Sequence, residues 1–278
     1  RVLERLRAFG FDSLTEDAEH YGPALALGDG EVKLVELASA YAALARGGLA
    51  RPVRLVTELV RDGARVAFEP GPTRRVVDER VAAIITDILA DRSARMSAFG
   101  DQNVLELEVD VAAKTGTSKG YRDNVAAGYT REVTVAVWAG NFDGSPMAEV
   151  SGITGAGPIF RAVMSAAARA RPPRPRALAL TPEEASRLGL ARTGVCALSG
   201  EIPRAACPHV VQEWLPDGDR DHAPVCGVHE RVRIDPATGL LASRACPDSE
   251  ERVVERWRPP YDAWARRVGR ALAPEGRS

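Results

Sequence analysis

The stretch "VDVAAKTGTSKG", residues 109–120, runs from an alternating apolar segment directly into Lys-Thr-Gly-Thr-Ser. Alternation with a period of two is typical of a half-buried β-strand. On such a strand Lys114 and Gly116 face one side, and Thr115 and Thr117 face the other. Because glycine has no Cβ, a ligand could lie flat against the backbone beside the lysine. We therefore expect an exposed strand end that binds a ligand.

The chemistry of this triplet favours binding at a carbonyl group. Lys114 would hold hydrogen bonds and add positive charge. A free backbone N–H near Thr117 could donate to a developing oxyanion, while the Thr117 hydroxyl could bind a carboxylate. The alternative is a strand end followed by a turn, with Lys114 simply solvated. The sequence has three lysines, at positions 33, 114 and 119, so a chance Lys-Thr-Gly or Lys-Ser-Gly would arise only roughly a few per cent of the time.

The same period of two continues on both sides of the triplet. It predicts strands over residues 107–116, 124–130 and 132–140, in an antiparallel meander. A helix over 157–170 follows, with Pro158 in its first turn.

The N-terminal third of the chain shows helical spacing instead. A helix over the first nine residues is expected to end at Gly10, and Asp62-Gly63 is expected to join two strands. Two longer helices follow from apolar stripes, the first ending at Gly47-Gly48 and the second capped by Asp78. The stripes are Val35, Ala38, Ala42 and Ala45 in the first helix, and Val81, Ile84, Ile85, Ile88 and Leu89 in the second.

Composition and charge limit the classes of function. The chain of 278 residues is 45% hydrophobic and 27% charged, with a formal net charge of −1. This balance gives no electrostatic footprint for nucleic acid or an anionic membrane. Prolines crowd residues 172–182, which indicates a break between domains. We expect a main domain over 1–170, a Pro/Arg-rich linker over 171–186 and a Cys-rich tail over 187–278.

Several phrases resemble one family of enzymes. "ALALGDGEVKLVELASAYAALARGGLARP" resembles the segment between the second and third motifs of penicillin-binding transpeptidase domains. "AAKTGTS", "TREVTVAVWAGNFDG" and "GAGPIFRAVM" look like the third-motif strand, the next strand and the C-terminal helix. "GVCALSGEIPRAACPH" and "VCGVHERVRID" are similar to class A bifunctional peptidoglycan synthases. The resemblance implies an α/β (α+β) fold like that of the transpeptidases and serine β-lactamases, incomplete at its N-terminal side, followed by a small irregular Cys-containing region.

The resemblance also implies a reaction. A serine would attack the D-Ala-D-Ala carbonyl of a stem peptide, and a second stem peptide would resolve the acyl-enzyme into a cross-link; β-lactams would acylate the same serine. Carried over by motif position, Lys114 is catalytic, and Thr115, Gly116 and Thr117 bind substrate, whereas Ser118 is only a neighbour of the motif.

The sequence departs from the family pattern in one important respect. No serine stands three residues before a lysine, and Ser-x-Asn is absent. The resemblance therefore predicts an inactive interior fragment, whose serine motifs, glycosyltransferase domain and membrane anchor would precede Arg1. It places the parent at the periplasmic side of the bacterial inner membrane, with stem peptides, β-lactams and cell-wall synthesis proteins as partners and with no cofactor. The alternatives are a serine β-lactamase-like hydrolase and a catalytically dead cell-wall docking module.

The cysteines all lie in the tail, at Cys196, Cys207, Cys226 and Cys246. The extracytoplasmic location that the family implies favours two disulfides and no metal. Cys196–Cys207 and Cys226–Cys246 are the expected pairs because short loops close most readily. A zinc site and free buried thiols are the alternatives. The zinc ligands would be Cys207, His209, Cys226 and His229.

Overall fold

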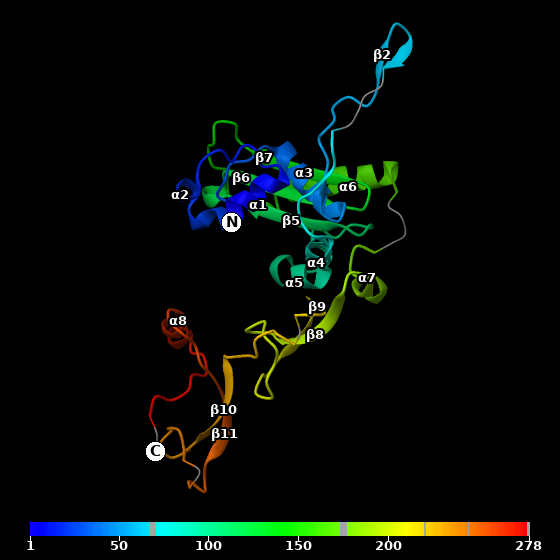
Figure 1. The fold of residues 1–278 in the computed structure, drawn as a ribbon. Coiled ribbons are helices and arrows are strands. Elements are labelled where there is room, and N and C mark those ends of the chain that lie inside the picture. Colours follow the sequence, from blue (N-terminus) through cyan, green and yellow to red (C-terminus); the bar gives the residue numbers. More distant parts are fainter. Residues whose placement is uncertain (67–70, 173–176, 220, 244, 277–278) are drawn as a thin grey trace. The chain divides into compact units, whose positions relative to one another are not determined.

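The computed structural model describes residues 1–66, 71–172, 177–219, 221–243 and 245–276 (Figure 1). The chain divides into two compact units, Arg1–Glu184 and Ala185–Ser278. Among the described residues, no helix is both long enough and apolar enough to cross a membrane.

The first unit is built on a three-stranded antiparallel sheet. Its strands are β5 (Ala112–Thr117), β6 (Asp123–Tyr129) and β7 (Thr134–Gly140), paired in the order β5-β6-β7. The predicted meander is therefore confirmed. The first strand, however, begins at Ala112 and not at Leu107. Leu107 is buried against the sheet without joining it, so its alternating pattern reflects packing of an irregular segment.

The two faces of this sheet carry different layers. Ala113 lies in a core with Phe160 and Met164 of α6 (Ala156–Ala170), which is the predicted C-terminal helix. Neighbouring Ala112 points to the opposite face, as the pleat requires. There it packs in a separate core with residues of α3 (Leu34–Ala45) and α4 (Glu79–Ala90). Figure 1 shows α3 and α6 beside the strands of this sheet.

The helices α3 and α4 form where they are expected, and Ala45 and Leu89 of the predicted stripes pack against the core, but the most deeply buried positions differ. In α3 the buried side chains include Ala40 and Ala43, whereas Val35 of the predicted stripe is 49% exposed. In α4 the buried residues are Ala82 and Thr86, whereas Val81 and Ile88 are exposed. Small residues on these faces allow the helices to approach their neighbours closely.

A buried polar contact joins α4 to the sheet. The hydroxyls of Thr86 and Tyr129 lie 2.8 Å apart, and Thr86 also donates to the carbonyl of Ala82. Burial raises the pKa of Tyr129 to about 12. The phenol therefore stays neutral and serves the packing of the helix, not the chemistry of a site.

The remaining elements of the first unit are short. Helix α1 ends at Gly10 in the left-handed conformation, as expected. Asp62 and Gly63 adopt positive φ between β2 and β3, which confirms the predicted turn. Asp78 caps α4 by accepting from the backbone N–H of Arg80. These elements are α1 (Val2–Phe9), α2 (Ala18–Tyr21), η1 (Pro23–Leu27), β1 (Leu49–Ala50), β2 (Leu59–Arg61), β3 (Ala64–Val66), β4 (Arg74–Arg75), α5 (Arg92–Phe99) and η2 (Lys119–Tyr121).

The predicted linker contains packed residues. Leu178 is buried in the core that includes Ala112 and Tyr129, and the backbone N–H of Leu180 donates to Asp87 Oδ1 at 2.8 Å. Residues 173–176 of the expected spacer lie outside the described residues. A short helix, α7 (Pro182–Arg187), occupies the end of the expected linker. The described part of this segment is thus less extended than its prolines suggested.

The second unit is more regular than the sequence indicated. Two antiparallel pairs replace the irregular tail that we expected, because half-buried alternation in these strands is hidden among charged residues. In β10, for example, His229, Val232 and Ile234 are buried between arginines and a glutamate. The strands are β8 (Leu190–Cys196) with β9 (Val210–Pro216) and β10 (His229–Ile234) with β11 (Glu250–Glu255), followed by α8 (Tyr261–Arg267).

Candidate active site

The Lys-Thr-Gly triplet lies on β5, which pairs with β6 on one side only in the described sheet. The backbone N–H of Ser118 donates to the carbonyl of Asp123 at 2.9 Å. Hydrogen-bonded pairs alternate along an antiparallel ladder. Counting back from Ser118, the N–H and C=O groups of Gly116 and Lys114 point toward β6. Those of Thr115 and Thr117 therefore point outward along the free edge.

Lys114 is exposed and lies next to this free edge. Its ammonium donates to the outward carbonyl of Thr115 at 2.5 Å. In the part of the chain that the structure describes, no carboxylate forms an ion pair with Lys114. The positive charge of Lys114 therefore lies at the strand edge without an acidic partner in the described residues. It is available to an anionic or polarised ligand.

Gly116 and Thr115 differ in what they offer a ligand. A Cβ placed on Gly116 would meet no atom within 4 Å, so this side of the strand is open. Thr115, by contrast, is 8% exposed and its side chain faces the loop around Gly152. The side chain of Thr115 is therefore not available at the open side of the strand, and only its backbone groups lie at the free edge.

Thr117 is held in place by the loop that precedes α6. The backbone N–H of Gly152 donates to Thr117 Oγ1 at 2.8 Å. This contact needs glycine, because a Cβ at position 152 would lie 2.4 Å from the carbonyl oxygen of Gly116. With its oxygen accepting from Gly152, the Thr117 hydroxyl keeps its own proton to donate to a ligand.

Sequence reasoning missed the residue that anchors this loop. Asn124, opposite Thr117 in the ladder, is fully buried, and its Nδ2 donates to the carbonyl of Val150 at 2.7 Å. The sequence signal was only a polar residue at the start of a strand, which also suits an exposed turn. Burial of Asn124 fixes the loop beside Thr117.

The turn after the triplet has a structural role. Ser118 Oγ donates to Asp123 Oδ2 at 3.0 Å, and the backbone N–H of Asp123 donates back to Ser118 Oγ at 2.8 Å. Trp138 Nε1 donates to the other carboxylate oxygen of Asp123 at 3.0 Å. These contacts agree with Ser118 as a neighbour of the motif.

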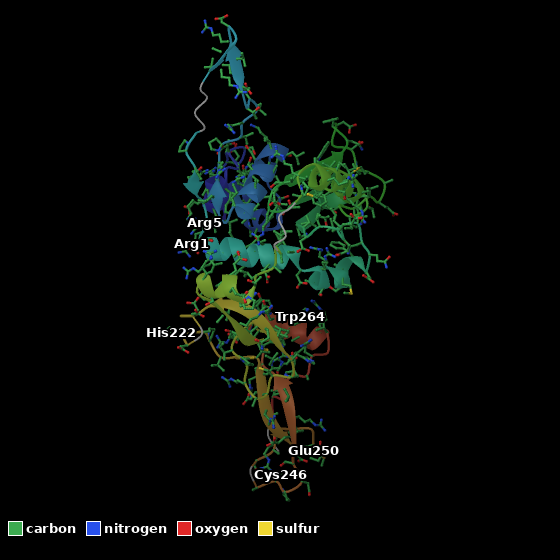
Figure 2. The ribbon with its side chains drawn as sticks, turned by 90° about the vertical axis from the view of Figure 1, so that its right-hand side faces the viewer. Arg1, Arg5, His222, Cys246, Glu250 and Trp264 are labelled. Atoms are coloured by element: carbon green, nitrogen blue, oxygen red, sulfur yellow. The ribbon has the colours of Figure 1, made fainter. Side chains whose placement is uncertain are left out.

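In the structure all four cysteines are free, and neither predicted pair, Cys196–Cys207 or Cys226–Cys246, is bonded. Cys226 precedes His229 at one end of β10, whereas the carbonyl of Cys246 accepts from Arg233 near the other end. Figure 2 labels Cys246 close to Glu250, which pairs with the last residue of β10. Six residues of strand separate these ends by about 17 Å, and a disulfide needs Cα atoms within about 7 Å.

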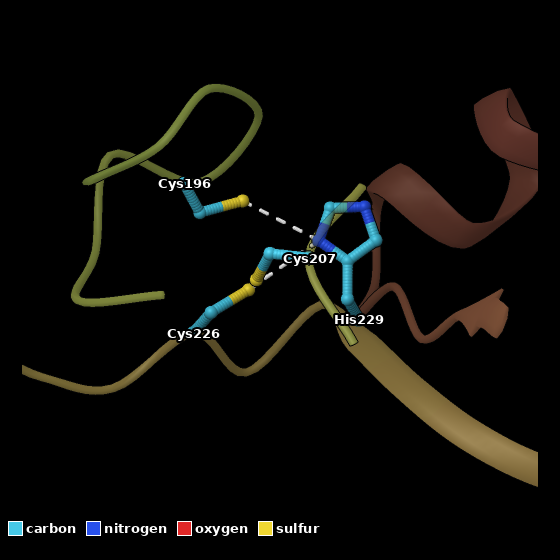
Figure 3. A group of neighbouring side chains, drawn as sticks. All are labelled: Cys196, Cys207, Cys226 and His229. Atoms are coloured by element: carbon cyan, nitrogen blue, oxygen red, sulfur yellow. Dashed lines mark hydrogen bonds between the residues drawn. The ribbon is translucent and has the colours of Figure 1, made fainter. Parts of the chain in front are cut away.

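A different set of side chains gathers in the second unit (Figure 3). The sulfurs of Cys196, Cys207 and Cys226 and a ring nitrogen of His229 all lie within 4.8 Å of one another. The zinc alternative had included His209, but His209 is exposed and outside this group. Cys196 takes its place.

Comparison with known proteins agrees with the geometry of β5. Residues 8–165 match the model of the penicillin binding protein transpeptidase domain. The chain belongs to this family. The fold is thus the penicillin-binding transpeptidase fold, and the matched residues include β5 and the first part of α6 but not the cysteine group.

Individual relatives support the same family. The chain is 25% identical to penicillin-binding protein 1C of Escherichia coli over 274 residues, which are 95% of this chain and 33% of that protein. It is 29% identical to penicillin-binding protein 1A of Mycobacterium tuberculosis over 168 residues, or 56% of this chain and 20% of that protein. The chain therefore spans a third or less of the length of these relatives.

Solved structures of penicillin-binding proteins are also similar. PonA1 of Mycobacterium tuberculosis in complex with penicillin V matches with a TM-score of 0.51 and 26% identity, covering 61% of this chain and 50% of that one. Penicillin-binding protein 1A of Haemophilus influenzae matches with a TM-score of 0.55 and 18% identity, covering 78% of this chain and 36% of that one. The second likeness bears on the fold alone.

Proposed function

We propose that the free edge of β5 binds the acyl-D-Ala-D-Ala end of a peptidoglycan stem peptide, and penicillins in the same way, during DD-transpeptidation. The observation that supports this most directly is the combination of an outward-facing backbone edge, an open glycine and a lysine with no carboxylate partner among the described residues. An extended peptide can add to such an edge through main-chain hydrogen bonds.

Each residue of the edge has a separate task in this proposal. Lys114 raises the positive potential where negative charge develops on the attacked carbonyl. Gly116 leaves room for the ligand backbone. Thr117 donates its hydroxyl proton to the terminal carboxylate while Gly152 holds its oxygen. The outward N–H of Thr117 can donate to the carbonyl under attack.

The acylated serine comes from outside these residues. Transpeptidation requires a nucleophile that forms an acyl-enzyme and returns it to a second amine. The chain contains no serine three residues before a lysine, and Ser118 is engaged by Asp123. We propose that the serine belongs to a longer gene product, which also polymerises glycan chains and acts at the outer face of the bacterial inner membrane.

Fluorescent penicillin tests this proposal. The full-length gene product should acquire a fluorescent band that survives denaturing electrophoresis, and excess unlabelled penicillin should abolish the band. The chain of 278 residues alone should not be labelled. A covalent label on this chain would contradict the proposed division of the site. An unlabelled full-length product would favour a docking module, and rapid loss of the label would favour a hydrolase.

A further inference from the structure

We propose that Cys196, Cys207, Cys226 and His229 bind one structural zinc ion that fixes the second unit. The four side chains come from three places in the sequence: the end of β8, the loop that follows it, and the start of β10. The fold therefore brings three sulfurs and one imidazole nitrogen together from segments that are separate in the sequence.

The two nitrogen–sulfur distances are close to those of a tetrahedral zinc site. With Zn–S near 2.3 Å and Zn–N near 2.05 Å, tetrahedral geometry places sulfur and nitrogen about 3.6 Å apart and two sulfurs about 3.8 Å apart. His229 Nδ1 lies 3.3 Å from Cys196 Sγ and 3.6 Å from Cys226 Sγ. Both contacts appear as dashed lines in Figure 3. A bound ion would replace these contacts with metal–ligand bonds.

Backbone N–H groups lie beside two of the sulfurs. The backbone N–H of Arg204 donates to Cys207 Sγ at 3.3 Å. Cys226 receives hydrogen bonds from the backbone N–H groups of Val228 and His229. The thiols would lose their protons when the metal binds, because the thiolate is the form that coordinates Zn²⁺.

The donor set selects zinc and a structural role. Three thiolates and one imidazole suit Zn²⁺ far better than Mg²⁺ or Ca²⁺, which prefer oxygen. Four protein ligands fill a tetrahedral shell, whereas a catalytic zinc keeps one position for water. Cys196 and Cys226 are fully buried, and His229 is 4% exposed, so water has little access to the ion.

A metal ion at this site would join the two pairs of strands in the second unit. The β8–β9 pair and the β10–β11 pair belong to separate two-stranded sheets. Backbone bonds between Ile202 and the segment just before β10 bring them together, with Cys226 N–H donating to the Ile202 carbonyl at 2.8 Å. The core of the second pair is small, with Val232, Ile234 and Val254 as its buried members. Small units with sparse cores commonly use metals or disulfides.

A carboxylate stands next to the proposed ligand histidine. Glu255 lies opposite His229 in the β10–β11 ladder and is bound by Arg270 at 2.6 and 2.8 Å. The hydrogen bond from Arg270 is the largest cause that lowers the pKa of Glu255. Glu255 accepts hydrogen bonds from Arg270 and Trp257, which hold its carboxylate in this position.

Metal analysis of the purified 278-residue chain tests the site. With reductant present and Zn²⁺ as the only added metal, wild type should retain about one zinc per chain after gel filtration. Cys196→Ser, Cys207→Ser, Cys226→Ser and His229→Asn should lose it. Cys246→Ser and His209→Asn are matched controls and should retain it. Absence of zinc from wild type, or equal loss in a control, would overturn the proposal.

Two further measurements test the site even if the variants that lose a ligand fail to fold. Co²⁺ bound to wild type should show the visible bands of a tetrahedral ion and strong thiolate charge transfer. His229→Cys should keep the metal and intensify the charge-transfer band. An octahedral Co²⁺ spectrum would overturn the site. The proposed site would also be overturned if protein isolated from its native compartment, with its thiols trapped at lysis, contained two disulfides.

Discussion

At the scale of single residues, the site depends on close approach between two glycines. Gly152 contacts the backbone of Gly116 and donates to Thr117, so that the loop before α6 and the end of β5 behave as one surface. The lysine and glycine of the triplet could be predicted from sequence because their chemistry is explicit in the motif. Gly152 and Asn124 could not, because their roles arise from contacts between segments far apart in the chain.

Gly152→Ala tests this close approach. The new methyl group would lie 2.4 Å from the Gly116 carbonyl oxygen, so the loop must move and the bond to Thr117 must lengthen. We expect the free energy of unfolding to fall by about 1–3 kcal/mol, measured by urea denaturation. Gly116→Ala is the control and should change stability by less than about 0.5 kcal/mol, because its Cβ meets open space. Equal stability of wild type and Gly152→Ala would contradict this description.

At the scale of elements, periodicity predicted where helices and strands form better than it predicted which residues they bury. The meander and α6 follow the period closely. In α4, however, the buried face contains Thr86, whose hydroxyl meets Tyr129. A hydrophobic pattern does not predict that a polar residue such as Thr86 is buried. The strands of the second unit were missed for the opposite reason, since charged residues interrupt their buried positions.

Helix α6 offers a matched pair of substitutions. Phe160 is fully buried against the sheet, whereas Ile159 on the same helix is 49% exposed. Phe160→Ala should lower the free energy of unfolding by about 3–5 kcal/mol. Ile159→Ala should cost less than about 1 kcal/mol. Circular dichroism during urea denaturation measures both, and similar losses would show that α6 does not supply the core of this unit.

At the scale of the whole molecule, the two units differ in what stabilises them. The first buries apolar side chains on both faces of a sheet, whereas the second is expected to rely on the proposed zinc ion. Because no cysteine precedes Cys196, the two should respond differently to a chelator. Hydrogen exchange after metal removal should rise in β8 and β10 and stay unchanged in β5–β7. Faster exchange throughout both units would show that the metal acts beyond the second unit.

The central claim is that Lys114 stabilises charge during acylation, and one comparison of rates tests it. In the full-length gene product, Lys114→Ala should slow labelling by fluorescent penicillin by about 10²–10³-fold, since one preorganised donor contributes roughly 3–4 kcal/mol. Lys119→Ala, in the adjoining turn, is the matched control and should be labelled at the wild-type rate. Labelling of Lys114→Ala as fast as wild type would contradict the assignment of the site to this strand.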